Sequence, residues 1–235
     1  MMINLKERSN QKEILDDFQG NSQELAAVLN DINRVNRILG GNRITVNEVF
    51  KLIDERPKDF YTILDVGCGE GSMLRELASL ARKKNISLKL IGIDLNAEAL
   101  TLAKQTSLDF PEIEFLEKDV LSADFSDSGC DIVITTLTMH HFQNSDILNF
   151  IKQFTRLTSI GVVINDLQRN ALAYYLFQVF SLIFIKTKVA KQDGLTSIRR
   201  GFWKSELKAL SSSLSDVHHE ISWKWAFRYV WIIRK

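Results

Sequence analysis

The stretch from residue 61 to residue 77 reads YTILDVGCGEGSMLREL and constrains the fold more than any other part of the chain. It begins with an apolar run, turns through glycines spaced G-x-G-x-G, and continues with apolar residues at helical spacing. A buried strand followed by a glycine-rich turn and a helix starts a doubly wound α/β sheet, in which ligands bind beyond the carboxyl ends of the strands. We therefore expect a mostly parallel sheet with a ligand site at this turn.

Acidic residues follow three successive apolar strands. Asp65 ends the first strand, two positions before Gly67, while Asp94 and Asp119 follow the apolar runs at 87–93 and 113–117. A carboxylate at position 65 would repel a dinucleotide's pyrophosphate but suits a ligand that carries an ammonium group. Asp94 is placed to accept hydrogen bonds from two ribose hydroxyls, which are strong when the acceptor is charged. Capping of the following helix by Asp94 is the structural alternative.

These residues resemble motif I and the later acidic positions of the class I S-adenosylmethionine-dependent methyltransferases of the small-molecule type. Residues 65–71, DVGCGEG, match the D-x-G-x-G-x-G pattern in full. The resemblance implies a seven-stranded Rossmann-like sheet of strand order 3-2-1-4-5-7-6 with a C-terminal antiparallel hairpin. It also implies S-adenosylmethionine as the cofactor, with S-adenosylhomocysteine as the product.

The resemblance assigns the cofactor contacts residue by residue. In the family, the acid at Asp94 binds the ribose, the acid at Asp119 meets the adenine amino group, and the backbone N–H of Val120 meets a ring nitrogen. Thr135 is expected beside the methionine portion. The full set of expected cofactor residues is Asp65, Gly67, Cys68, Gly69, Asp94, Leu95, Asp119, Val120 and Thr135.

Residues 135–142, TTLTMHHF, resemble motif IV of small-molecule methyltransferases. They lack the N-P-P-[YF] run of enzymes that methylate amino groups of nucleobases or of glutamine, which counts against those substrates. His140 and His141 are the candidate catalytic residues, because a histidine with a pKa near neutrality can take a proton from a phenol or enol. A packing role for the pair is the alternative. No metal is expected, since no cluster of ligands at metal-binding spacing falls near these histidines.

The apolar segment 171–185 has three interpretations. It is too short to span a bilayer, which takes about 20 residues. It is a buried core helix, the lining of a hydrophobic acceptor pocket, or an interfacial helix that brings Lys186, Lys188 and Lys191 to a membrane surface. Residues 191–203 are polar and contain a glycine, so we expect a loop that takes part in acceptor recognition.

The acceptor side is expected to use several charged and aromatic residues. Residues 166–174, DLQRNALAY, and 193–200, DGLTSIRR, resemble methyltransferases of polyketide and aromatic-lipid pathways. That similarity implies a small hydrophobic or aromatic acceptor of phenol, quinol or polyketide type, methylated at oxygen or activated carbon in secondary metabolism. A surface cluster of ion pairs, worth little energetically, is the alternative for the charged residues. The candidate substrate-binding residues are Arg37, Asp166, Arg169, Tyr174, Arg199 and Arg200.

We divide the chain into a helical N-terminal cap over residues 1–56 and a methyltransferase domain over 57–235, with an acceptor-side insertion at about 166–203. Helical spacing over 25–39 ends at Gly40-Gly41, and a second helix covers 46–53. Arg34, Arg37 and Arg43 either form part of a lid over the cofactor or occupy the solvated face of an amphipathic helix.

Charge and composition exclude some classes of protein. Thirty basic and 29 acidic residues give a net charge of +1, so no general basic field exists for nucleic acid. The polar N-terminal residues indicate a cytoplasmic protein, and two cysteines are too few for a disulfide framework or a zinc site. A nicotinamide-dependent oxidoreductase and a non-catalytic, cofactor-binding partner subunit remain alternatives, and the oligomeric state cannot be read from the sequence.

Overall fold

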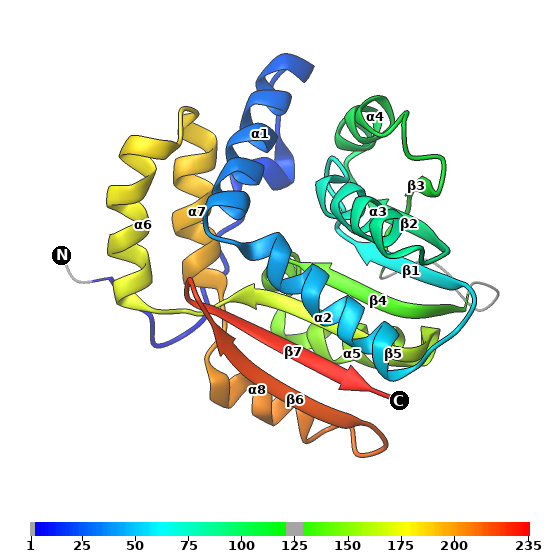
Figure 1. Cartoon of the computed structure of the whole chain (residues 1–235). Coiled ribbons are helices and arrows are strands. Elements are labelled where there is room, and N and C mark those ends of the chain that lie inside the picture. Colours follow the sequence, from blue (N-terminus) through cyan, green and yellow to red (C-terminus); the bar gives the residue numbers. More distant parts are fainter. Residues whose placement is uncertain (1–2, 121–128) are drawn as a thin grey trace.

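A computed structural model describes residues 3–120 and 129–235, which form an α/β fold around a central sheet (Figure 1). The strands lie in the order β3-β2-β1-β4-β5-β7-β6, so the predicted seven-stranded order is confirmed. The first five strands are parallel, and β7 is antiparallel to both β5 and β6, as expected for the terminal hairpin. The strand bounds are β1 Tyr61–Val66, β2 Leu88–Asp94, β3 Ile113–Glu117, β4 Cys130–Thr136, β5 Thr158–Leu167, β6 His218–Lys224 and β7 Arg228–Arg234.

The two faces of the sheet carry separate apolar cores. On one face α2 (Gly41–Glu55) and α3 (Ser72–Lys84) pack on the strands through residues such as Leu52 and Leu74. On the other face α5 (Asn144–Leu157) and α8 (Lys204–Ser211) contribute Phe150 and Leu207. Because helices cover both faces, the central strands β1 and β4 are buried along most of their length, as their apolar runs predicted.

The N-terminal helices follow the predicted pattern but divide between two roles. The 3-10 helix η1 (Ile14–Asp17) and α1 (Ser22–Ile38) lie at the carboxyl edge of the sheet, while α2 belongs to the core. Gly40 separates α1 from α2 with a φ of +70°, a left-handed conformation that glycine adopts without steric cost. The second helix of the predicted cap therefore packs in the core of the sheet, and the division into a cap and a methyltransferase domain stays a prediction.

The prediction of a loop over residues 191–203 is wrong, because the structure forms helix α7 (Lys188–Arg200) there. Thr187 caps the start of this helix with its side chain. Gly194, which suggested a loop, instead permits close packing, since a Cβ at this position would lie 2.2 Å from the Phe177 ring of α6. A glycine inside a helix costs roughly 1 kcal/mol relative to alanine, and here the contact between α6 and α7 offsets that cost.

Helix α6 (Ala171–Phe184) is not the buried core helix that was the first interpretation of its sequence. Only Ala173 and Ser181 of this helix are buried. It packs against α7 along one side and forms the outer edge of the molecule in Figure 1. Its other side therefore presents apolar residues to the surroundings. Among the residues that the structure describes, no helix combines the length and the apolar character needed to cross a bilayer.

Candidate active site

A cavity of about 1000 Å³ lies at the carboxyl ends of the parallel strands. The glycine turn after β1 and the ends of β2 and β3 form one part of its lining, and α1, α6 and α7 form another. The position agrees with the rule that open α/β sheets bind ligands beyond the strands' carboxyl ends. The cavity is the candidate active site.

The glycine turn brings bare backbone to the cavity. Gly67 has a φ of +74°, and a Cβ there would lie 2.4 Å from the side chain of Thr138. Gly69 has a φ of +53° and open space where its Cβ would be, so the backbone here leaves room for a ligand. The N–H of Gly69 donates to Asp94 Oδ2 over 2.8 Å, and the N–H of Asn96 donates to Asp94 Oδ1 over 2.9 Å. Asp94 thereby links the glycine turn to Asn96, and Asn96, not Asp94, caps the following helix, α4 (Ala97–Thr106), with its side chain. Binding of the ribose hydroxyls by Asp94 stays a prediction.

Asp65 is an unusual carboxyl group, 2 % exposed at the end of β1. Burial, together with the charge of Asp94, raises its pKa to about 8. A cationic ligand group beside it would restore the ionised form, which fits the ammonium group of S-adenosylmethionine. Burial also raises the pKa of the Cys68 thiol, so Cys68 is not a thiolate nucleophile at neutral pH.

Most of the predicted cofactor residues line this cavity. They are Asp65, Gly67, Cys68, Gly69, Asp94, Leu95, Asp119 and Val120. Thr135 does not line it: the side chain is buried within β4, and its hydroxyl has no hydrogen-bond partner. The next residue, Thr136, lines the cavity instead, because successive side chains of a strand point to opposite faces.

Helix α1 reaches the glycine turn through an asparagine. Asn33 Nδ2 donates to Glu70 Oε1 over 2.5 Å, and Asn33 Oδ1 accepts a hydrogen bond from Ser72 Oγ over 3.0 Å. Asn33 and Asn36 line the cavity, whereas the arginines proposed for a lid, at positions 34, 37 and 43, are exposed. Arg37 borders a separate, smaller pocket. The polar side chains of α1 that line the cavity are therefore asparagines, and a lid role for α1 stays a prediction.

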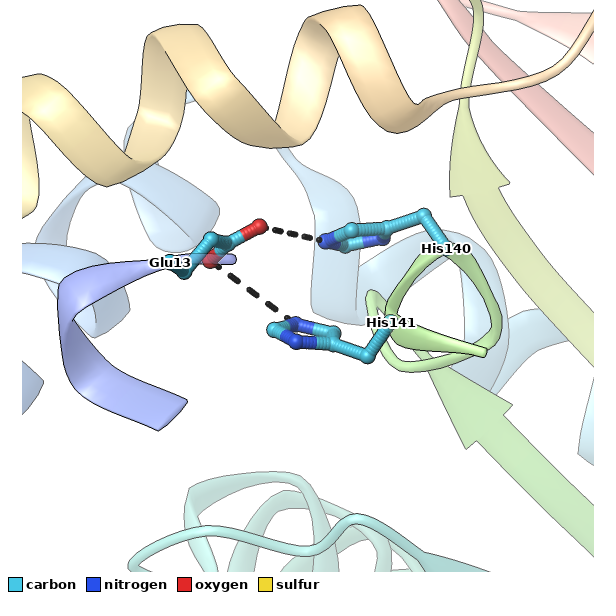
Figure 2. A group of neighbouring side chains, drawn as sticks. All are labelled: Glu13, His140 and His141. Atoms are coloured by element: carbon cyan, nitrogen blue, oxygen red, sulfur yellow. Dashed lines mark ion pairs between the residues drawn. The ribbon is translucent and has the colours of Figure 1, made fainter. Parts of the chain in front are cut away.

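The two candidate catalytic histidines lie on the 3-10 helix η2 (Met139–His141), which follows β4. Figure 2 shows that the carboxylate of Glu13 points toward both imidazoles. Glu13 Oε1 lies 3.3 Å from His140 Nε2, and Glu13 Oε2 lies 3.8 Å from His141 Nε2. All three residues line the cavity, so the histidines and Glu13 form one polar cluster.

His140 is held by carboxylates on both sides. Its Nδ1 lies 2.7 Å from Asp166 Oδ1, and its backbone N–H donates to Asp166 Oδ2 over 3.0 Å. Burial opposes the charged imidazolium, but Asp166 and Glu13 outweigh burial and raise the pKa of His140 to about 9. His140 is therefore protonated at neutral pH, which makes it a poor proton acceptor there.

His141 has the more accessible imidazole. Its side chain is 27 % exposed, against 2 % for His140, and its Nδ1 lies 2.8 Å from Asp16 Oδ1. Burial works against the ionised form of Asp16, but His141 and Arg200 hold the pKa of Asp16 below its usual value. Because an ionised carboxylate only accepts hydrogen bonds, Nδ1 of His141 donates, and its Nε2 is left to face Glu13 and the cavity.

Glu13 is fixed by the N-terminal segment and α7. Ser197 Oγ donates to Glu13 Oε1 over 2.7 Å, and the Asp193 carboxylate accepts the N–H groups of Ile14 and Leu15 at 2.8 and 2.9 Å. Glu13 is 6 % exposed. Nothing in the sequence around residue 13 indicates this role, since no motif or apolar periodicity marks it as part of a site.

The cluster also bears on metal binding. One donor atom from each of Glu13, His140 and His141 lies within 4.8 Å of the others. The expected absence of a ligand cluster beside these histidines is therefore wrong, because Glu13 reaches them from a distant part of the chain. The expectation that the protein needs no metal stays a prediction.

The predicted substrate residues divide into two groups. Asp166 contacts His140, and Arg200 lines the cavity while donating to the carbonyls of His140 and His141 at 3.0 and 2.6 Å. Arg169 instead pairs with Glu206 and donates to the Gly201 carbonyl, which ties the end of α7 to α8. Neither Arg199, whose side chain contacts Gln11, nor Tyr174 is among the cavity-lining residues.

Aliphatic and aromatic side chains from α1, from the residue after it and from α6 line another part of the cavity. They are Leu29, Ile32 and Val35 of α1, Leu39 directly after it, and Ala173, Leu176, Phe177 and Phe180 of α6. The interpretation of segment 171–185 as a pocket lining therefore agrees with the position of its inner face.

Comparison with known proteins gives a family for the central part of the chain. Residues 63–161 match a family model described as a methyltransferase domain. The chain is 37 % identical over 65 residues to a 2-phytyl-1,4-naphtoquinone methyltransferase of Thermosynechococcus vestitus, a match covering 28 % of each protein. It is 36 % identical over 72 residues to a ubiquinone/menaquinone biosynthesis C-methyltransferase of Rickettsia prowazekii, covering 29 % of each. The matches thus span less than a third of these two relatives.

Solved structures align with a larger share of the chain than these sequence matches do. The plantazolicin methyltransferase BpumL, solved with S-adenosylhomocysteine, aligns with a TM-score of 0.66 at 17 % identity, covering 94 % of this chain and 99 % of that one. The magnesium protoporphyrin IX methyltransferase of Synechocystis PCC 6803, also solved with S-adenosylhomocysteine, aligns with a TM-score of 0.57 at 14 % identity, covering 83 % and 84 %. At these identities the likeness shows the fold.

Proposed function

We propose, on the premise that residues 63–161 form a methyltransferase domain of the S-adenosylmethionine-dependent class, that the chain methylates a small hydrophobic or aromatic acceptor at oxygen or activated carbon. One observation carries the proposal: a single cavity joins the acidic strand ends to an apolar wall from α1 and α6. The acidic ends suit a sulfonium nucleoside, and the apolar wall suits the acceptor.

The cofactor half of the cavity has the donors and acceptors that S-adenosylmethionine needs. Asp94 would hold the ribose hydroxyls, Asp119 and Val120 the adenine, and Asp65 the ammonium group. The bound cofactor supplies an activated methyl group, so the protein's main task is to align the acceptor with it. Alignment of this kind lowers a barrier by about 7–11 kcal/mol.

His141 is the better candidate for a general base. An acceptor that arrives as a phenol or enol must lose a proton as the methyl group is transferred, and a positioned base contributes about 10²–10⁴-fold to the rate. Asp16 orients the His141 ring through Nδ1 and leaves Nε2 to accept the proton. His140 then acts as a positioning residue, because its imidazolium holds Glu13 and Asp166 in place.

Several similar proteins are named for unsaturated, largely apolar acceptors, and two others are named for ribosomal RNA. Two relatives with sequence similarity are named for naphthoquinone and for ubiquinone or menaquinone, and a structural neighbour is named for a porphyrin. The apolar wall of the cavity here is consistent with a ring system or an acyl chain of this kind. Quinol-like and polyketide-like acceptors are therefore the first to test.

The outer side of α6 supports contact with a membrane surface. Its exposed apolar residues include Val179, Leu182 and Ile183, with exposed fractions of 61 %, 71 % and 71 %. Lys186 and Lys188 follow the helix and are exposed, so anionic headgroups would meet positive charge beside the apolar face. Because the inner side of the same helix lines the cavity, an acceptor dissolved in the membrane would have a short path to it. Such contact is compatible with the expected cytoplasmic location.

The decisive experiment is incubation of the purified chain with S-adenosylmethionine labelled in the methyl group and a panel of phenols, quinols and polyketide-like acids. We expect label in at least one acceptor, and loss of that label in an Asp94→Ala variant. Binding of S-adenosylhomocysteine without transfer to any acceptor, in the presence or absence of vesicles, would favour a non-catalytic partner subunit. Binding of NADH in preference to S-adenosylhomocysteine would contradict the proposal.

A further inference from the structure

Arg228, the first residue of β7, is a buried cation with incomplete hydrogen bonding. Arg228 is 2 % exposed and lines the cavity. Nη2 donates to Asn36 Oδ1 over 2.9 Å, whereas Nε and Nη1 have no hydrogen-bond partner. A guanidinium offers five N–H donors, so most of this group's capacity is unused. Burial lowers the pKa of Arg228 to about 10, which still leaves it charged at neutral pH.

The surroundings do not neutralise this charge. Asp166 is the carboxylate whose charge acts on Arg228, but it is already engaged by His140. Gly41, the first residue of α2, packs so closely that a Cβ there would lie 2.8 Å from Arg228 Nη2. The start of a helix carries a positive partial charge, which adds to the positive potential. A buried charge without a paired partner costs several kcal/mol, so the arrangement calls for an anionic ligand.

The position in the sheet favours the acceptor over the cofactor as the source of that anion. Arg228 pairs in register with Leu167 at the end of β5. Strand β1, which carries Asp65 and leads into the glycine turn, lies three places away across β5 and β4. With strands about 4.8 Å apart, this separation is about 14 Å. The backbone of Arg228 therefore lies three strands from Asp65, and its guanidinium reaches Asn36, beside the apolar cavity-lining residue Val35.

We propose that Arg228 binds an anionic oxygen group of the acceptor, a carboxylate by preference. This inference rests on the proposed methyl transfer and narrows its substrate class to amphiphiles with an apolar body and one acidic group. A planar guanidinium suits a carboxylate because two parallel N–H groups can donate to its two oxygens. The apolar residues of α1 and α6 would hold the rest of the molecule.

The test compares two probes of the same shape, 4-pentylbenzoate and 4-pentylbenzyl alcohol. Each displaces the neutral fluorophore N-phenyl-1-naphthylamine from the protein loaded with S-adenosylhomocysteine. We expect the acid to bind about tenfold or more tightly than the alcohol, as a charge-assisted pair predicts. Arg228→Met should abolish this preference, Arg228→Lys should keep part of it, and Arg34→Met, which removes an exposed arginine of α1, should leave it unchanged.

Three results would overturn the proposal. One is an equal affinity of the wild-type protein for the acid and the alcohol, and another is a preference that survives Arg228→Met. The third is a large loss of affinity for S-adenosylhomocysteine in Arg228→Met, which would assign the guanidinium to the cofactor's carboxylate. Methyl transfer itself is measured separately with labelled cofactor, so any of these results leaves the proposed activity open to its own test.

Thermal unfolding of the same variants gives an independent readout. Arg228→Met also breaks the hydrogen bond from Arg228 to the buried Asn36, so melting temperatures serve to confirm that each variant is folded. A wild-type melting temperature that rises more with 4-pentylbenzoate than with 4-pentylbenzyl alcohol would support the proposal, and an equal rise with the two probes would contradict it.

Discussion

The carboxylate of Asp31 in α1 accepts two hydrogen bonds from Thr187, one from the backbone N–H over 2.7 Å and one from the hydroxyl over 2.9 Å. The N–H of Lys186 donates to the same oxygen over 2.9 Å. Asp31 is 5 % exposed, and Thr187 is the residue that caps α7. A single buried carboxylate therefore joins the covering helix α1 to the pair α6 and α7 on the acceptor side.

Replacing Asp31 by alanine should lower stability. The change leaves buried N–H donors without a partner, which costs about 1–3 kcal/mol. Urea denaturation followed by circular dichroism measures this loss, with Asp216→Ala, at an exposed aspartate, as the control. Equal stability of the Asp31→Ala and Asp216→Ala variants would show that the link contributes nothing.

Replacing Asp94 by alanine should weaken binding of S-adenosylhomocysteine by about tenfold or more, because charged acceptors for the ribose hydroxyls are lost. Isothermal titration calorimetry measures the affinity, and Asp109→Ala, at an exposed acid outside the cavity lining, is the matched control. Asp94 also holds Gly69, so melting temperatures should be compared first. An unchanged affinity in a folded variant would remove Asp94 from the cofactor site.

Cofactor binding should release a proton. In the unliganded protein Asp65 has a pKa of about 8 and is mostly neutral at pH 7, and pairing with an ammonium group ionises it. Affinity for S-adenosylhomocysteine should therefore rise as pH increases from about 6 to about 8. Calorimetry in buffers of different ionisation enthalpy detects the proton, and Asp65→Asn should lose the effect. Proton release that persists in Asp65→Asn would assign the proton to another group.

The raised pKa of Asp65 also predicts how the free energy of unfolding depends on pH. A carboxyl whose pKa is raised by folding stabilises the fold below its unfolded pKa, and this contribution disappears as pH rises through the folded pKa. Relative to Asp65→Asn, the unliganded wild type should lose stability between pH values of about 4 and 8. If the free energy of unfolding changed with pH in the same way for both proteins over this range, the raised pKa of Asp65 would be contradicted.

Replacing His141 by alanine should reduce turnover of a protonated acceptor by about 10²-fold, the lower end of the range for general bases. Affinity for S-adenosylhomocysteine should stay constant, since His141 contacts Glu13 and Asp16 rather than the glycine turn. Single-turnover transfer of labelled methyl measures the rate, with His218→Ala, at an exposed histidine of β6, as the control. Full turnover in His141→Ala would rule out the base.

Glutamates introduced on the outer side of α6 should weaken the binding of the protein to lipid vesicles. We expect the double change Val179→Glu and Ile183→Glu to reduce co-sedimentation with vesicles that contain anionic lipid, because it removes apolar area and adds repulsion. Leu108→Glu places the same charge at an exposed leucine outside α6 and should have no effect. If wild type fails to sediment and instead forms a dimer that the double variant loses, α6 is a contact between copies.

The cofactor half of the site was predictable because its signals are local. Asp65, Gly67 and Gly69 lie within five positions, and Asp94 and Asp119 each follow an apolar run that marks a strand. Parallel strands place all these residues at one edge of the sheet. The prediction of Thr135 misses by one position, because Thr136 is the threonine that lines the cavity. A family pattern gives the end of the strand but not which of two neighbouring threonines faces the cavity.

The acceptor half was only partly predictable. His140 and Arg200 line the cavity and Asp166 contacts His140, while the roles predicted for all three stay predictions. Glu13, Asn36 and Arg228 lie in no recognisable pattern, and only tertiary packing brings them to the cavity. Gly194 was misleading, since its function is to let α7 approach Phe177 closely and not to open a turn. Contacts between distant segments of this kind leave no periodicity in the sequence.

The two halves of the cavity therefore differ in how the chain encodes them. Residues 65–120 supply the contiguous half, within the range that matches the methyltransferase family, whereas positions 13, 36, 200 and 228 lie outside that range. A substitution at one of these dispersed positions would change the cavity wall without changing the sequence of the glycine turn. We therefore expect such substitutions to alter which molecules the cavity admits more than they alter the geometry of the turn.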